Sequence, residues 1–356
     1  MSAQSPLTNR LQGFGASIFA EMTALAVSTG SINLGQGFPD YNGPAEVLQI
    51  AQDQISAGNN QYPPGIGMAD LRLAVSGHQD RFWGLIYDPA TEILVTMGAT
   101  EALAGALLGI LNDGDEVIVF EPLFDTYAGC IALAGAVSVP ITLRPQQSGR
   151  YEFDADELRR SITPRTRMIL LNSPHNPTGS VFTLEELQTI AAIAIEHDLI
   201  VISDEVYEHL VFDNNTHIPI ATLPGMFERT ITISSGGKSF NTTGWKIGWT
   251  IAPPNLTAGI RAAHQFLTFC SATPLQRAAV DALQAPRSYY EALRADYLMR
   301  RDVMLTVLRG AGFDPYVPDG SYFVVAEHER FGFPNDFAFA LHLVEKVGVA
   351  CIPCGA

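Results

Sequence analysis

Short apolar runs that recur along the middle of the chain restrict the fold more than any other feature of this sequence. Each run has the length of a strand, is apolar on both faces, and is separated from the next by a stretch with helical spacing. Strands of this kind belong to a mostly parallel sheet that helices cover on both faces. We therefore predict an α/β fold with strands in EILVTMGA (92–99), EVIVFEP (116–122), MILLNSP (168–174), LIVISDE (199–205) and TITISS (230–235).

The sequence also predicts helices between and after these strands. Thr183 and Glu186 have the spacing of a capping box, so we expect a helix from there to about His197. Further helices are expected over 100–111 and near 289–310.

The change of pattern along the chain suggests two domains. We expect the sheet region, residues 44–270, to form a large domain. Residues 271–356 contain a long helix and short apolar runs such as 321–328, which predicts a smaller α+β domain. Residues 1–43 have no place in the order of the sheet, and we assign them to this smaller domain.

Polar clusters follow the predicted strands at the points where the strands end. In open parallel sheets, ligands bind outside the carboxyl ends of the strands. Polar loops are common, but five such clusters at five strand ends favour one composite site. The clusters are GAT, EPLFDTY, NSPHNPTG, DEVY and SSGGKS.

Composition excludes several classes of function. The formal net charge of −16 repels nucleic acid and anionic membranes, so neither is an expected partner. The first ten residues lack the pattern of a secretion signal, and we expect a cytoplasmic protein. Four cysteines do not make a disulfide scaffold. Cys351 and Cys354 form CIPC, but no second pair of metal ligands is evident, so no metal is predicted.

Lys238 lies in SSGGKSFNTTGWKIGW (234–249), which superficially resembles a phosphate loop. A P-loop needs glycine five residues before Gly237, where this chain has Thr232. The glycine fingerprint of dinucleotide-binding folds is also incomplete at every Gly-x-Gly of the chain. Neither nucleotide motif therefore explains this lysine.

A lysine, a buried carboxylate and a phosphate cradle together suit pyridoxal phosphate. The cofactor's aldehyde condenses with a lysine amine, for which Lys238 is the candidate. Its pyridine nitrogen needs an opposite charge, which Asp204 at the end of an apolar strand can supply, although a lone aspartate there is more often a turn or cap residue. Its phosphate fits the first N–H groups of the helix over 100–111.

The same segments resemble signatures of the class I/II aminotransferases, which are fold-type-I enzymes. The lysine segment has serine three residues before Lys238, an aromatic residue two after it, and then TGWKIGW. NSPHNPTG and SDEVY resemble two further signatures in the family's order. Four more segments of this chain are similar to the branch of kynurenine, glutamine, methionine and N-succinyldiaminopimelate aminotransferases. These four are NLGQGFPD (33–40), NQYPPGIG (60–67), GATEAL (98–103) and EPLFDTY (121–127). The segment LQGFGASIFAEMTALA (11–26) resembles the same branch.

The resemblance implies a seven-stranded, mostly parallel sheet, a homodimer, and a transaminase that works by a ping-pong mechanism through a Lys238 aldimine. It implies that Asp204 pairs with the pyridine nitrogen and that Tyr207 and Asn176 bind the phenolic oxygen. It implies cis peptide bonds before Pro122 and Pro177. The remaining implied cofactor contacts are the ring stack of Phe124, the phosphate ligands Gly98, Ala99, Thr100, Ser235 and Lys246, and Tyr62 from the neighbouring subunit.

The substrate side leaves alternatives open. Gly35 and Asn176 resemble residues that line the substrate carboxylate pocket, and Phe14, Ile18, Phe19 and Phe269 are candidates for an apolar pocket. The resemblance implies a further segment beyond GVACIP with a carboxylate-binding arginine, so we expect either that this chain is truncated there or that another group binds the carboxylate. Besides a transaminase, the residues allow a cysteine-conjugate β-lyase or a cofactor-binding homologue with little activity, and they do not name the amino donor.

Overall fold

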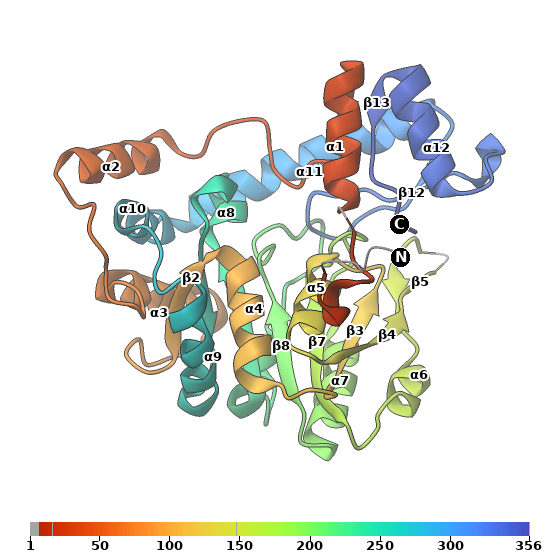
Figure 1. Ribbon diagram of the computed structural model, residues 1–356. Coiled ribbons are helices and arrows are strands. Elements are labelled where there is room, and N and C mark those ends of the chain that lie inside the picture. The colour runs from red at the N-terminus through yellow and green to blue at the C-terminus, as the bar shows by residue number, and fades with distance from the viewer. Residues whose placement is uncertain (1–6, 16, 147, 356) are drawn as a thin grey trace, which may run out of the picture.

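A computed structural model describes residues 7–15, 17–146 and 148–355 of the chain. Residues 1–6, and residue 16 of the segment 11–26, therefore lie outside the described residues. The centre of the structure is a seven-stranded sheet with the order β2-β10-β9-β8-β7-β3-β4 (Figure 1). Only β10 runs against its two neighbours; the other pairs are parallel, so the prediction of a mostly parallel seven-stranded sheet is confirmed. The strands are β2 (Ile93–Met97), β3 (Glu116–Glu121), β4 (Val137–Thr142), β7 (Thr166–Asn172), β8 (Ile200–Asp204), β9 (Thr230–Ser235) and β10 (Ile247–Ile251).

Two of these strands, β4 and β10, are not among the five predicted from apolar runs. Strand β4 lies at the sheet edge, is half exposed and contains Pro140, so it lacks a doubly apolar pattern. Strand β10 is as long as the predicted strands β2 and β8, but Gly248 interrupts its apolar pattern. A Cβ at Gly248 would lie 2.5 Å from the carbonyl carbon of Gly98, so glycine is needed where β10 passes the start of helix α4 (Gly98–Ile110).

Helices cover both faces of the sheet, as the apolar runs predict. Ile131 and Ile260 belong to the core under α4, α5 and α9, and Leu158 and Ile190 to the core under α6 and α7. The predicted capping box at Thr183 and Glu186 is present, and it begins α7. The covering helices are α3 (Ala69–Trp83), α4 (Gly98–Ile110), α5 (Thr126–Leu133), α6 (Ala155–Arg160), α7 (Leu184–Glu196), α9 (Pro254–Leu267) and α10 (Thr273–Leu283). Helix α2 (Ala45–Ser56) packs on α10 (Figure 1).

Segments from near the two ends of the chain pack together beside the sheet (Figure 1). Ile32 of β1 pairs in parallel with Val349 of β13, and Met22 of α1 is buried in the same cluster as Val344. Of the apolar run 321–328, only Ala326–Glu327 is a strand. The elements are α1 (Ile18–Thr29), β1 (Ile32–Asn33), α11 (Arg287–Gly310), β11 (Asp314–Pro315), β12 (Ala326–Glu327), α12 (Asp336–His342), a π-helix (Leu343–Val347) and β13 (Val349–Ala350).

The remaining elements of the fold are short. The boundaries between the two domains, at residues 43/44 and 270/271, remain a prediction. Within the described part of the chain, every helix is too short or too polar to cross a membrane. The short elements are the hairpin of β5 (Arg144–Pro145) and β6 (Tyr151–Glu152), the single turn α8 (Gly236–Ser239), and 3-10 helices at Asn9–Leu11, Ile220–Thr222, Phe227–Arg229, Thr243–Trp245 and Glu329–Phe331.

Candidate active site

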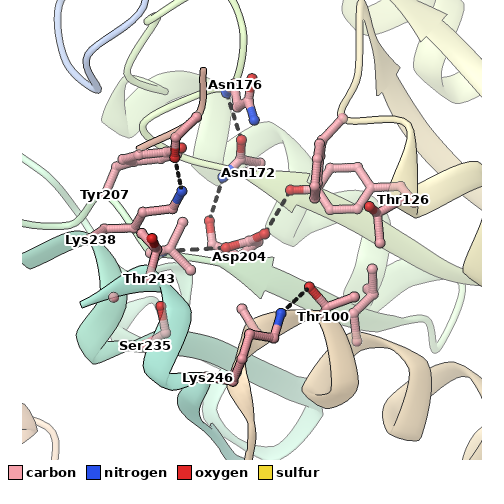
Figure 2. Close-up of a pocket in the computed structure, with 18 of the residues that line it drawn as sticks. Thr100, Thr126, Asn172, Asn176, Asp204, Tyr207, Ser235, Lys238, Thr243 and Lys246 are labelled. Carbon is pink, nitrogen blue, oxygen red and sulfur yellow. Dashed lines mark hydrogen bonds between the residues drawn. The ribbon is translucent and has the colours of Figure 1, made fainter. Parts of the chain in front are cut away.

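A cavity of about 230 Å³ lies at the carboxyl ends of the central strands. Strand β7 ends at Asn172, β8 at Asp204 and β9 at Ser235, and all three residues line the cavity (Figure 2). Helix α4 begins at Gly98, directly after β2. The sequence-predicted residues in the lining are Gly98, Ala99, Thr100, Phe124, Asn176, Asp204, Tyr207, Ser235, Lys238 and Lys246.

The carboxylate of Asp204 is buried and held on several sides. The hydroxyl of Tyr127 donates to Oδ2 at 2.7 Å, and the backbone N–H of Val206 donates to Oδ1 at 3.3 Å. The side-chain amide of Asn172 donates to the Asp204 carbonyl at 2.9 Å, which ties the ends of β7 and β8 together. Burial raises the pKa of Asp204, and the hydrogen bond from Tyr127 opposes this rise. The site therefore suits a cation placed against this carboxylate.

The amine of Lys238 points into the same cavity (Figure 2). Lys238 lies on the single turn α8 that follows β9, and its Nζ donates to the Gly37 carbonyl at 2.9 Å and to the Tyr322 hydroxyl at 2.8 Å. Nζ also lies 5.4 Å from the centroid of the Tyr207 ring. Burial, followed by the neighbouring Tyr322, holds the pKa of the Tyr207 phenol well above its usual value, so Tyr207 is a neutral donor.

Hydrogen-bond donors gather at the other end of the cavity, around the start of α4. Gly98 has a φ of 74°, and Lys246 Nζ lies 3.4 Å from Thr100 Oγ1. Ser235 and Thr243 add hydroxyl groups to the lining. Burial and then Lys238 lower the pKa of Lys246. A helix N-terminus, three hydroxyls and an amine are the donors that bind an anion such as phosphate.

This donor set fits pyridoxal phosphate. An anion cradle at one end, a buried carboxylate deeper in the cavity and a free amine beside it match the phosphate, the pyridine nitrogen and the aldehyde of the cofactor. Phe124 supplies an aromatic wall, with its ring centroid 6.5 Å from that of Phe19. The peptide bonds before Pro122 and Pro177 are cis, as predicted, and so is the one before Pro174.

Two residues predicted to contact the cofactor or the substrate carboxylate, Tyr62 and Gly35, lie outside the cavity lining. The side chain of Tyr62 is 83% exposed and packs edge-on against Phe269, with the ring centroids 5.7 Å apart. Gly35 donates its N–H to Asn33, and a Cβ there would lie 2.8 Å from Ile352. Gly37 lines the cavity instead. Of the four residues proposed for an apolar pocket, namely Phe14, Ile18, Phe19 and Phe269, the lining contains Phe19.

Several lining or contacting residues were not predicted. Tyr127 and Asn172 lie inside EPLFDTY and NSPHNPTG, so their motifs contained the signal, but no role was assigned to them. Thr243 likewise lies in the lysine segment. Tyr322 contacts Lys238 from a distant segment, and nothing in its local pattern indicates this contact.

Another buried polar group lies outside the cavity lining. Within the described residues, His78, Glu208 and His209 are close enough to share a metal ion. They also have protein partners: the Nε2 atoms of His78 and His209 are 2.8 Å apart, and Glu208 accepts hydrogen bonds from Trp83 and Ser234 at 2.7 and 2.9 Å. Burial raises the pKa of Glu208 to about 7.

Cys351 and Cys354 are free thiols.

Comparisons with known proteins agree with this geometry. A family model described as aminotransferase class I and II matches residues 29–356. A probable N-succinyldiaminopimelate aminotransferase of Mycobacterium tuberculosis is 50% identical over 348 residues, covering 98% of this chain and 87% of the relative. The solved structure of that enzyme type from the same organism has a TM-score of 0.95 at 49% identity, over 97% of this chain and 89% of that one.

A solved Escherichia coli structure identified as a methionine aminotransferase is also similar, with a TM-score of 0.93 at 36% identity over 98% of this chain and 91% of that one. A kynurenine–oxoglutarate transaminase of Dictyostelium discoideum is 40% identical over 98% of this chain and 88% of the relative. These matches confirm the predicted branch of relatives and the fold-type-I architecture.

Proposed function

The chain belongs to the class I and II aminotransferase family, and we propose that it moves an amino group from an amino acid to a 2-oxo acid with pyridoxal phosphate attached to Lys238. The observation that carries this proposal is the meeting of Lys238 and Asp204 in one cavity with an anion cradle. When bound, the cofactor supplies an electron sink for the electrons left when a substrate Cα loses its proton. We propose a ping-pong order, in which donor and acceptor use the same site in turn.

Each group in the cavity has a defined task under this proposal. The N–H groups at the start of α4, with Thr100, Ser235 and Lys246, would hold the phosphate. Asp204, kept in place by Tyr127 and Asn172, would hold a proton on the pyridine nitrogen. Phe124 would cover the ring.

The remaining side chains act on the substrate and on the cofactor's oxygen. Tyr207 and Asn176 would donate hydrogen bonds to the phenolic oxygen. Lys238 Nζ would take the proton from the substrate Cα and return it in the reverse half-reaction, because it is the amine at the centre of the cavity.

The donor is proposed from the relatives and from the wall of the cavity. Relatives are named for N-succinyldiaminopimelate, kynurenine and methionine. Phe19, Phe124 and Phe323 line the cavity, which suits a side chain with an apolar portion next to the amino acid group. A donor panel should therefore contain N-succinyldiaminopimelate, kynurenine and methionine. We also propose that Gly35 and Asn176 lie near the carboxylate of the bound substrate.

We also propose a homodimer in the cytoplasm. The side chain of Tyr62, which packs against Phe269, is 83% exposed. The side chain of Phe266, three residues before Phe269, is 86% exposed. Exposed aromatic side chains of this kind favour an interface between subunits. In such a dimer Tyr62 would reach the phosphate of the neighbouring site.

The test is the visible absorption spectrum of the protein with pyridoxal phosphate, before and after adding each donor. The band of the covalently attached cofactor should appear, bleach with a donor, and return with a 2-oxo acid. Lys238→Ala should lack the band, while Lys346→Ala, which changes a lysine outside the cavity lining, should keep it. A band that Lys238→Ala retains would refute the attachment. Pyruvate and ammonia formed without a 2-oxo acid would indicate a β-lyase, and a band that no donor changes would indicate a binding homologue.

A further inference from the structure

The hydroxyl of Tyr322 contacts the reactive amine of Lys238 from a segment outside every predicted signature. Lys238 Nζ donates to Tyr322 Oη at 2.8 Å and to the Gly37 carbonyl at 2.9 Å. The Tyr322 hydroxyl also donates to the Gly37 carbonyl. These three groups form a closed triangle of hydrogen bonds, so the amine has a defined position next to the cavity.

The backbone on the N-terminal side of Tyr322 is held in place by the large sheet region. Ser321 is buried, has a φ of 61°, and donates its N–H to the Leu210 carbonyl at 2.8 Å. Gly320 donates to the Gly179 carbonyl at 2.8 Å. A serine at positive φ persists where its surroundings over-determine the backbone, and these two hydrogen bonds do so here. The segment that presents Tyr322 is therefore not an ordinary mobile loop.

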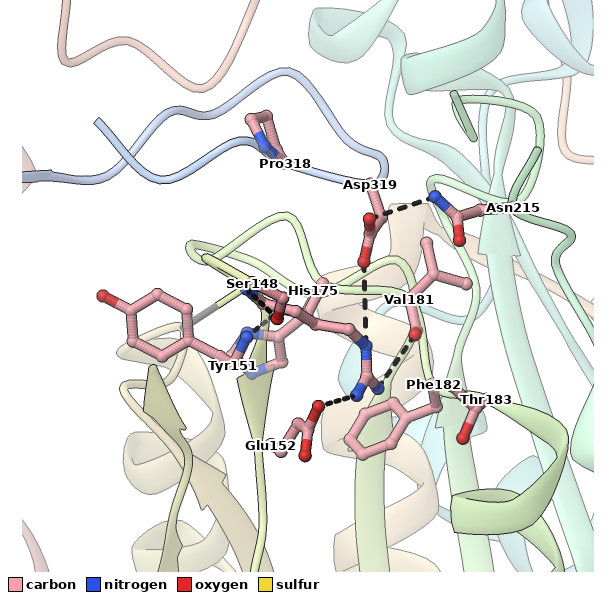
Figure 3. Close-up of polar contacts among 12 residues, drawn as sticks. Ser148, Tyr151, Glu152, His175, Val181, Phe182, Thr183, Asn215, Pro318 and Asp319 are labelled. Carbon is pink, nitrogen blue, oxygen red and sulfur yellow. Dashed lines mark hydrogen bonds and ion pairs between the residues drawn. The ribbon is translucent and has the colours of Figure 1, made fainter. Parts of the chain in front are cut away.

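Asp319 anchors the same segment through its side chain and its backbone. Figure 3 shows its carboxylate between Asn215 and a guanidinium group, which belongs to Arg150. The amide of Asn215 lies 3.0 Å from Oδ1, and Arg150 Nε lies 3.7 Å from Oδ2. The Asp319 carbonyl accepts the N–H of Phe212 at 2.7 Å. The position of Tyr322 is thus tied to the segment that follows Tyr207.

The ring of Tyr322 is held independently of its hydroxyl. It stacks on Tyr297, with centroids 5.8 Å apart and an interplanar angle of 23°, and meets Tyr207 edge-on at 5.2 Å. A phenylalanine at position 322 would keep both ring contacts. The contribution of the hydroxyl can therefore be tested without removing the packing.

We propose that Tyr322 is a positioning residue that, together with the Gly37 carbonyl, holds the Lys238 amine ready whenever this amine is not attached to the cofactor. The inference rests on the proposed role of Lys238. The form of an amine that attacks an aldehyde is the neutral one, which has two N–H groups and one lone pair. The carbonyl of Gly37 and the oxygen of Tyr322 accept one N–H each, which leaves the lone pair free to react. Without the hydroxyl the amine keeps one acceptor and spends more time in other orientations.

The first test measures attachment rather than turnover. Protein freed of cofactor is mixed with pyridoxal phosphate, and the rate at which the absorption band of the attached cofactor develops is followed in a stopped-flow instrument. We expect Tyr322→Phe to slow attachment about tenfold, the factor expected for one lost hydrogen bond, and to leave the final amplitude unchanged. In steady state, kcat should fall while KM changes little, because the change acts on the lysine and not on substrate contacts.

Tyr297→Phe is the matched control. Tyr297 lies in the same aromatic stack, and its hydroxyl lies 3.3 Å from Asn241 rather than next to Lys238. This variant should attach the cofactor at the rate of the unaltered protein. Equal rates for Tyr322→Phe and the unaltered protein, or equal slowing in both variants, would overturn the proposal.

A double variant separates an effect through Lys238 from a direct effect on the cofactor. In the Lys238→Ala background, non-covalent cofactor affinity is measured with and without Tyr322→Phe. We expect no further loss from Tyr322→Phe, because the residue acts through the lysine. A further loss would show direct cofactor contact and overturn the proposal. If Lys238→Ala itself retains the covalent band, the proposed function fails; if only the Tyr322→Phe result fails, the proposed function stands.

Discussion

Replacing Tyr127 by phenylalanine tests whether the hydrogen bond from the Tyr127 hydroxyl to Asp204 favours the ionised form of this buried carboxylate. The substitution removes one oxygen and keeps a ring that is buried in the core beside α4. The lost hydrogen bond is 2.7 Å long, and both partners are buried. A hydrogen bond to a charged group contributes about 1.5–3 kcal/mol, and one between neutral groups about 1 kcal/mol. The cost of the substitution should therefore depend on the protonation of Asp204.

The pH dependence of this cost has a definite sign. Burial raises the pKa of Asp204 in the folded protein, and the Tyr127 hydrogen bond counteracts the rise. While Asp204 is protonated in the folded protein, Tyr127→Phe should lower the free energy of unfolding by about 1 kcal/mol. As pH rises through the folded-state pKa, the deficit should grow to about 2 kcal/mol, because the ionised carboxylate loses the stronger bond.

The assay is urea unfolding of protein without cofactor at a series of pH values from about 4, close to the ordinary carboxyl pKa, up to 8, followed by far-UV circular dichroism. Tyr87→Phe is a suitable control, because Tyr87 is also buried but stacks on Phe227, away from Asp204. Its deficit should not vary with pH. A Tyr127→Phe deficit that stays constant over this range, or that shrinks as pH rises, would refute the argument about Asp204.

Four further substitutions have defined outcomes. Lys246→Met should weaken binding of pyridoxal phosphate about tenfold but leave binding of unphosphorylated pyridoxal unchanged, which fluorescence titration with both ligands would check. Burial raises the pKa of Glu208 from 4.5 to about 7. The folded protein should therefore lose on the order of 1–3 kcal/mol of unfolding free energy as pH rises through this window. Glu208→Gln should remove this pH dependence, which urea unfolding at pH 5 and at pH 8 would check. His264 contacts Glu101 at 3.0 Å and has a raised pKa despite its burial, so it stabilises the protein below its unfolded pKa and loses this effect as pH rises through the folded value. The deficit of His264→Gln should therefore be largest at acidic pH and shrink above neutral pH. Thr183→Ala should lower the melting temperature by removing the N-cap of α7, a loss of about 1 kcal/mol, and Thr183→Ser should restore it.

The prediction of the sheet depended on short-range patterns, and these were sufficient where a strand is a continuous run of apolar or β-branched residues. The five runs became strands because side chains that are buried on both faces of a strand are mostly apolar, with the buried threonines and serine of β9 as exceptions. The edge strand β4 and the glycine-containing β10 lack this pattern, so they were found only in the structure. The capping box of α7 was predicted because its two hydrogen bonds lie within four residues.

The sequence by itself determined the family and the placement of Lys238 and Asp204 at strand ends, because each depends on residues close together in the chain. The tertiary structure decided which distant groups complete the site. Tyr322 meets Lys238 across 84 positions, and the Gly37 carbonyl meets it across 201. A local pattern records which face of a segment is buried but not which segment covers it. The partners of the Lys238 amine therefore emerge only when the chain is packed.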